Sequence, residues 1–128
     1  MKYYFSKTIG GPFEAAVEKV KAELKKQGFG ILTEIDVQKT LKEKLNVEFR
    51  NYRILGACNP PNAYKALLAE DKIGLMLPCN VIVQELAGGL VEVAAIDPVA
   101  SMAAVKNPAL EPVAMEVRAN LKKVVDSL

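Results

Sequence analysis

The sequence contains no histidine and no tryptophan. The absence of histidine excludes Ser-His-Asp triads, Cys-His nucleophile pairs, histidine-ligated zinc or haem, and imidazole proton shuttles. The two cysteines, Cys58 and Cys79, fit neither a CxxC redox motif nor a disulfide scaffold. Sparse cysteines are typical of a reducing compartment, so we expect a cytoplasmic protein.

Other classes of protein are disfavoured by what the chain lacks. No apolar run is long enough for a membrane span, and the first residues do not form a signal peptide. No GxxxxGK[ST], GxGxxG or GxSxG motif occurs. The net charge is only +2, and glutamates intersperse the lysines. We therefore expect neither a nucleic-acid partner nor a membrane partner.

The composition is that of an ordinary globular protein. The chain has 128 residues, of which 51% are hydrophobic and 25% charged. This length suits one domain with its own core, and no repeat, linker or low-complexity tract divides it. We expect a single domain over residues 1–128.

Hydrophobic periodicity predicts five strands and two long helices. The strands are expected over residues 2–8, 29–35, 52–58, 79–86 and 90–96. One long helix begins near Pro12, and the other begins near Pro108 or Pro112. Shorter helices are expected after Asp36, after Pro60 and after Asp97.

This order predicts an α+β fold, a two-layer sandwich with the topology β-α-β(4)-α and short helical insertions. Two long helices can cover one face of a mainly antiparallel sheet. The strands around Gly88 are apolar on both faces, however, and a sheet with one wet face alternates more cleanly. Either the short helices or a second copy of the chain covers the second face, and we expect a homodimer.

The cysteines mark the first places where chemistry is expected. Each stands before an asparagine at a predicted strand end, in the segments Cys58-Asn59-Pro60 and Pro78-Cys79-Asn80. A thiol at a helix N-terminus can have a lowered pKa, whereas a buried cysteine behaves as a small apolar residue. Both interpretations remain open for each cysteine.

The two thiols become neighbours if their strands pair antiparallel. Cys58 and Cys79 are then able to form a reversible disulfide or to share a soft metal ion such as Cu(I) or Zn. Two thiolates are too few for a closed zinc site, so further ligands must come from elsewhere. Asp97 is either a helix cap or a carboxylate facing the same cleft. Met76 and Met102 are interpreted as core residues.

Three groups of residues together resemble a known family. They are Ile54–Pro60, Ile73–Val83 and Ile96-Asp97-Pro98. The joint Cys-Asn-Pro, Leu-Pro-Cys and Asp-Pro pattern resembles domain-of-unknown-function family 302, and especially its single-domain bacterial conserved hypothetical proteins. The resemblance covers nearly the whole chain and implies a two-layer β-α-β(4)-α fold. It implies no established activity, substrate or cofactor.

Two functional hypotheses follow from the residues. The first is a thiol-centred protein that binds a small ligand or a soft metal or acts in redox chemistry, with Cys58, Asn59, Cys79, Asn80 and Asp97 at its site. The second is a non-catalytic homodimeric module that binds a ligand or partner and whose cysteines are core residues. Enzymatic activity is left open, and no organic cofactor is expected.

Overall fold

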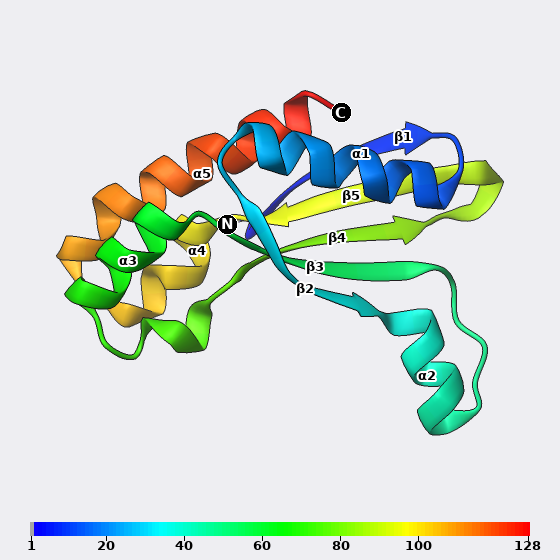
Figure 1. Ribbon diagram of the computed structural model, residues 1–128, viewed down its shortest axis with the longest axis horizontal. Helices are drawn as coiled ribbons and strands as arrows, with labels where there is room; N and C mark the ends of the chain where they lie inside the picture. The colour runs from blue at the N-terminus through cyan, green and yellow to red at the C-terminus, as the bar shows by residue number, and fades with distance from the viewer. Residues whose placement is uncertain (1) are drawn as a thin grey trace.

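The computed structural model describes residues 2–128, and its centre is one five-stranded sheet (Figure 1). The spatial order of the strands is β1-β5-β4-β3-β2, and every neighbouring pair is antiparallel. The strands are β1 (Tyr4–Gly10), β2 (Gly30–Asp36), β3 (Tyr52–Cys58), β4 (Cys79–Glu85) and β5 (Leu90–Ile96). The predicted α+β class with its antiparallel sheet is confirmed.

The two long helices, α1 (Phe13–Lys26) and α5 (Glu111–Asp126), lie on one face of the sheet (Figure 1). The shorter helices are α2 (Val37–Leu45), α3 (Pro60–Ala69) and α4 (Pro98–Met102). Four short 3-10 turns lie between the larger elements, at Ile73–Met76, Ala87–Gly89, Ala103–Val105 and Pro108–Leu110. The chain order is therefore β-α-β(4)-α with helical insertions.

The core lies between the sheet and these two helices. Alternate strand residues point into it, and Leu55, Val81 and Val93 are completely buried. Leu24 of α1 and Leu121 of α5 are also completely buried and belong to the same cluster. We call this side of the sheet the helix side and the other the open face.

A bulge in β2 changes which of its residues face the helices. The alternation of Ile31, Thr33 and Ile35 predicts that all three share one side. In the structure the register shifts between Ile31 and Thr33, so that Ile31 pairs with Ala57 but Thr33 pairs with Gly56. Ile31 packs against the core, whereas Ile35 lies on the open face and is 45% exposed.

No short helix covers the open face. Helices α3 and α4 gather at one end of the sheet against α5, whereas α2 projects from the β2 edge on the side opposite α1 and α5 (Figure 1). Helix α2 contains no buried residue. Of the two coverings expected from the sequence, the short helices are excluded.

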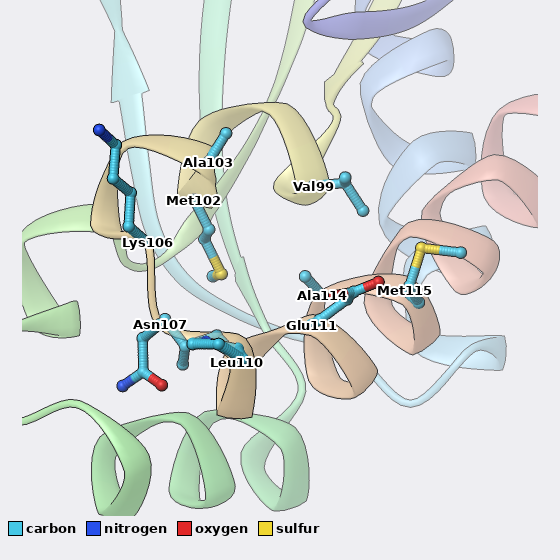
Figure 2. Close-up of a pocket in the computed structure, with 10 residues that line it drawn as sticks. Val99, Met102, Ala103, Lys106, Asn107, Leu110, Glu111, Ala114 and Met115 are labelled. Atoms are coloured by element: carbon cyan, nitrogen blue, oxygen red, sulfur yellow. The ribbon is translucent and has the colours of Figure 1, made fainter.

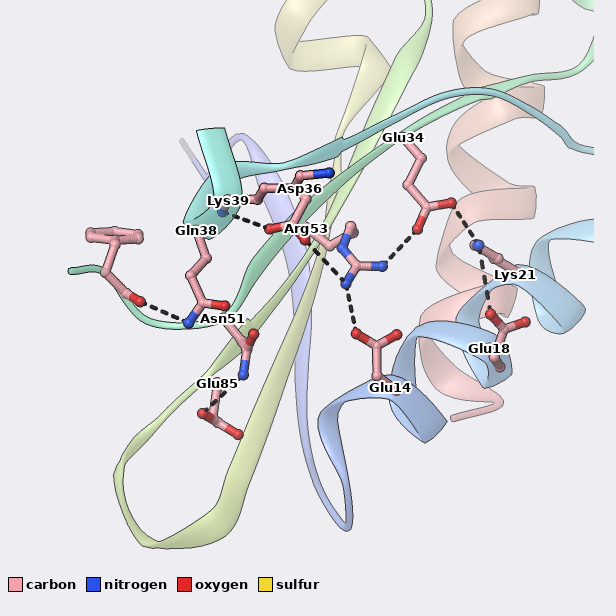
Figure 3. A network of polar contacts seen from close by, with 11 residues as sticks. Glu14, Glu18, Lys21, Glu34, Asp36, Gln38, Lys39, Asn51, Arg53 and Glu85 are labelled. Carbon is pink, nitrogen blue, oxygen red and sulfur yellow. Dashed lines mark hydrogen bonds and ion pairs between the residues drawn. The ribbon is translucent and has the colours of Figure 1, made fainter. Parts of the chain in front are cut away.

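An ion-pair network ties α1 to the edge of the sheet (Figure 3). The guanidinium of Arg53 lies 2.7 Å from Glu14 of α1 and 2.7 Å from Glu34 of β2, and the second oxygen of Glu34 lies 2.6 Å from Lys21. The hydrogen bond from Lys21 lowers the pKa of Glu34, and Arg53 lowers it further against the opposing effect of burial. The network fixes the N-terminal part of α1 over β2 and β3.

We predict that Lys21→Met raises the pKa of Glu34, because it removes the largest stabilising contact of this carboxylate. Arg53→Met should raise it less. Carboxyl NMR titration measures both effects, with Lys26→Met as the control because Lys26 pairs with Glu23 instead. An unchanged Glu34 titration in Lys21→Met contradicts the network.

Candidate functional site

Cys58 lies at the junction of β3 and α3. It is the last residue of β3, and α3 begins two residues later at Pro60. The side chain of Asn59 caps the helix, because its Oδ1 accepts a hydrogen bond from the backbone N–H of Asn62 at 3.3 Å. Proline suits the first helical position, where no intrahelical N–H bond is lost. The cap fixes the direction in which the chain leaves Cys58.

Cys79 begins the neighbouring strand β4. Its register partner is Ala57, so the end of β3 meets the start of β4. Cys58 and Cys79 both line a small cavity of about 20 Å³. Met102, the last residue of α4, lines the same cavity. Two cysteines and one methionine, from three separate segments of the chain, are thus among the residues that border the cavity.

Asn62 contributes an unsatisfied polar group to this cavity. The residue is only 4% exposed and lies among the cavity-lining side chains. Its Nδ2 donates to Asn59 Oδ1 at 3.2 Å, but its own Oδ1 has no hydrogen-bond partner among the described residues. A buried carbonyl oxygen without a partner is costly, so this oxygen is a free acceptor in the wall of the cavity.

Two glycines permit the close packing around this site. A Cβ atom at Gly56 would clash with Thr33 and would lie 2.8 Å from Cγ of Pro78, the residue before Cys79. Gly28 has a φ of +83°, and a Cβ there would lie 3.3 Å from Nδ2 of Asn59. Glycine therefore lets the chain approach both cysteine segments closely.

Both thiols are held in the protonated form at neutral pH. Burial raises the pKa of Cys79 to about 11, and the nearby Cys58 adds to the rise. Burial also raises the pKa of Cys58. The helix N-terminus beside Cys58 therefore does not produce the lowered pKa that the sequence left open. Both cysteines are free.

The other two residues of the expected site lie elsewhere. Asn80 is exposed on the open face, on the opposite side of β4 from Cys79. Asp97 is buried and caps α4 by accepting from the backbone N–H of Val99 at 3.0 Å. Its second oxygen accepts from Nε of Arg118 at 3.1 Å. Neither residue lines the cavity that Cys58 and Cys79 share.

A larger pocket also has Met102 in its lining (Figure 2). Its volume is about 370 Å³, and it is formed by α4, the following turns and the start of α5. Met102 and Met115 contribute sulfur to it, and Lys106 and Glu111 contribute charge. The Met102 side chain therefore borders both this pocket and the thiol cavity.

Asn62 is a cavity residue that sequence reasoning missed, whereas Met102 is buried in the core, as expected, and lines the cavity as well. Asn62 stands three residues after Asn59, on the first turn of a predicted helix, and this spacing is the only signal for it. Nothing near Met102 in the sequence points to the cysteines, because the contact depends on how α4 packs. Among residues 2–128, no three His, Cys, Asp or Glu side chains cluster closely enough to hold a metal.

A comparison with known protein families gives a match over nearly the whole chain. The family model described as "Domain of unknown function DUF302" matches residues 5–128, which is nearly the whole chain. The chain belongs to this family. The resemblance inferred from the Cys-Asn-Pro, Leu-Pro-Cys and Asp-Pro pattern is thereby confirmed. Membership in DUF302 assigns no activity.

Among solved structures, the chain is similar to the uncharacterized conserved protein DUF302 from Bacillus stearothermophilus. The two share 25% sequence identity with a TM-score of 0.90, and the match covers 98% of each chain. No curated protein matches the chain. In the part of the chain that the structure describes, no helix has the length and apolar character needed to cross a membrane.

We predict that Asp97→Ala lowers the free energy of unfolding by about 1–3 kcal/mol, because it removes a helix cap and leaves Arg118 unpaired. Asp97→Asn retains a capping oxygen and should cost less. Urea denaturation measures both. A variant Asp97→Ala as stable as the wild type contradicts the structural role of this carboxylate.

The raised pKa of Cys79 predicts a loss of stability in alkali. The unfolded thiol deprotonates first, above its ordinary pKa of 9.0, whereas the folded thiol retains its proton up to about pH 11. Stability is therefore present below pH 9 and falls between pH 9 and pH 11, by about 2–3 kcal/mol from this group. Denaturation curves of the wild type and Cys79→Ala at several pH values measure it. If the free energy of unfolding falls equally with pH in the wild type and in Cys79→Ala, Cys79 is not the group responsible for the loss.

Proposed function

We propose that the protein binds a single soft metal ion, with Cu(I) as the expected ion, in the cavity between Cys58, Cys79 and Met102. The observation that carries the proposal is that Cys58, Cys79 and Met102, the three sulfur-bearing residues of this region, all line one small cavity. Thiolate and thioether are the ligands that select Cu(I). Zinc is less suitable, because it prefers four ligands and rarely takes a thioether.

The size of the cavity supports a monatomic ligand. About 20 Å³ accommodates one water molecule or one ion, and no organic molecule. Asn62, whose Oδ1 is unpartnered, lines the same space and offers a further oxygen. On binding, two metal–sulfur bonds form to the cysteines and the two thiol protons pass to solvent, with no change in oxidation state.

Redox chemistry at the thiols is a weaker candidate. Thiolate is the form that attacks a disulfide or an oxidant, and both cysteines have a raised pKa. We therefore favour metal binding over a reversible disulfide. A reducing, cytoplasmic compartment fits this proposal, because both thiols must remain reduced to bind Cu(I).

The alternative is a ligand- or partner-binding homodimer in which the cysteines only fill the core. The 370 Å³ pocket beside Met102 favours it, because this volume lies within the range of small-molecule sites. Its lining is mainly apolar with Lys106 and Glu111 available for polar contacts. In this alternative, replacing both cysteines leaves binding intact.

We predict that the wild-type protein binds one Cu(I) or Ag(I) per chain and that Cys58→Ser and Cys79→Ser abolish this binding. Met102→Leu should weaken it at least about tenfold, because the thioether is lost while the volume is kept. Competition with a colorimetric Cu(I) chelator measures affinity, and the metal should also raise the melting temperature.

Met76→Leu is the matched control, since Met76 is 38% exposed and lies outside the cavity lining. Affinity should increase with pH, because protons compete with the metal for both thiols. If the double variant Cys58→Ser/Cys79→Ser binds the metal as well as the wild type, the proposal fails and the core interpretation stands.

A further inference from the structure

An apolar row crosses four of the five strands on the open face of the sheet. The register places Ile35, Ile54, Ile82 and Ala94 in one row across four adjacent strands, and Ser6 continues the row on β1. Isoleucines on the solvent side of three neighbouring strands are unusual for a sheet face in water. None of the described helices covers this row.

Polar and aromatic residues on either side of the row form a groove. Tyr4, Tyr52 and Ile96 border a depression of about 400 Å³ with Ile82 in its wall. Glu92 is the single charged side chain that the described strands place on this face, and it accepts a hydrogen bond from Gln84 at 2.7 Å. Tyrosines around an aliphatic centre with little charge are typical of the core of a protein interface.

Helix α2 projects on the open-face side of the sheet, and its apolar stripe is only partly covered by β2 and β3. Its apolar stripe consists of Val37, Leu41 and Leu45, and Leu45 is 66% exposed. The helix contacts only the β2–β3 edge of the sheet, and its loop is secured where Gln38 donates to the backbone oxygen of Phe49 at 2.9 Å. A well-formed helix with an apolar stripe and no buried residue normally packs on something.

We infer that the occupant of the open face is a second copy of this chain, with α2 of each copy packing against the sheet face of the other. Both complementary surfaces lie on one side of the same molecule, which is the requirement of a two-fold symmetric interface. The charges also match, because α2 carries Lys39, Lys42 and Lys44 against one glutamate, while the face carries Glu92.

The available area agrees with such a dimer. Five strands about 4.8 Å apart with seven residues rising about 3.4 Å each give the face a footprint of roughly 550 Å². A stable interface takes about 800 Å² of accessible surface from each partner. The nine residues of α2 form a segment about 13 Å long and about 10 Å wide, which adds a footprint of roughly 130 Å².

The dimer surface and the sulfur cavity are separate. Cys79 points to the helix side of β4, whereas Ile82 points to the open face. Neither proposal therefore requires the other, and each fails by its own measurement.

Sedimentation equilibrium of the full chain from low to high micromolar concentration tests the inference. The wild type should have about twice the chain mass of 13.9 kDa. Ile82→Lys, at the centre of the row, and Leu45→Glu, on α2, should each raise the dimer dissociation constant at least about tenfold. Leu45→Glu carries little risk to folding, because this side chain is already exposed in the single chain.

Leu68→Glu is the matched control, because Leu68 is 71% exposed but lies on α3, which packs against α5 at the end of the sheet. It should remain a dimer, and circular dichroism should be alike for all variants. A monomeric wild type overturns the inference. A dimer that survives either Ile82→Lys or Leu45→Glu overturns it as well.

Discussion

The packing of α1 and α5 against the same face of the sheet is the interaction on which the other features of the molecule depend. It buries Val81, Val83 and Val93 completely and orders the strands that carry both cysteines. Since both long helices pack on the helix side of the sheet, the apolar residues of the open face are left without a covering helix. The short helices lie at one end and at the β2 edge of the sheet and leave the open face uncovered.

Cys58, Cys79 and Met102 come together at the end of the sheet occupied by α3 and α4. Antiparallel pairing alone joins the end of β3 to the start of β4, and this brings Cys58 and Cys79 to one place. Met102 arrives there because α4 packs on α5, which in turn is fixed by the main core. The cavity is therefore a product of the layer arrangement and not of any local sequence motif.

Much of the fold follows from local patterns in the sequence. The stripe of α1 and the alternation of β4 and β5 predict their elements well, because periodicity reports directly which side of an element is buried. The bulge that turns Thr33 and Ile35 to the open face is not visible in this way, since one extra residue reverses the alternation without any change of composition.

The site residues also differ in whether local patterns or long-range packing bring them together. The association of Cys58 with Cys79 can be predicted from strand pairing, whereas the contribution of Met102 depends on long-range helix packing. Asp97 has the residue type of a ligand or base, but a buried carboxylate needs hydrogen bonds, and the N–H of Val99 and the guanidinium of Arg118 supply them. Residue type alone does not distinguish these two uses.

The burial of the thiols has a consequence for which ions can enter the cavity. Displacing the proton of Cys79 at pH 7, from a group whose pKa is about 11, costs roughly 5 kcal/mol. An ion that binds sulfur weakly, such as Mg²⁺, gains too little from the thiolate to offset this cost, whereas Cu(I) forms strong bonds to thiolate. The same burial that makes the cysteines poor nucleophiles therefore favours soft ions over hard ones.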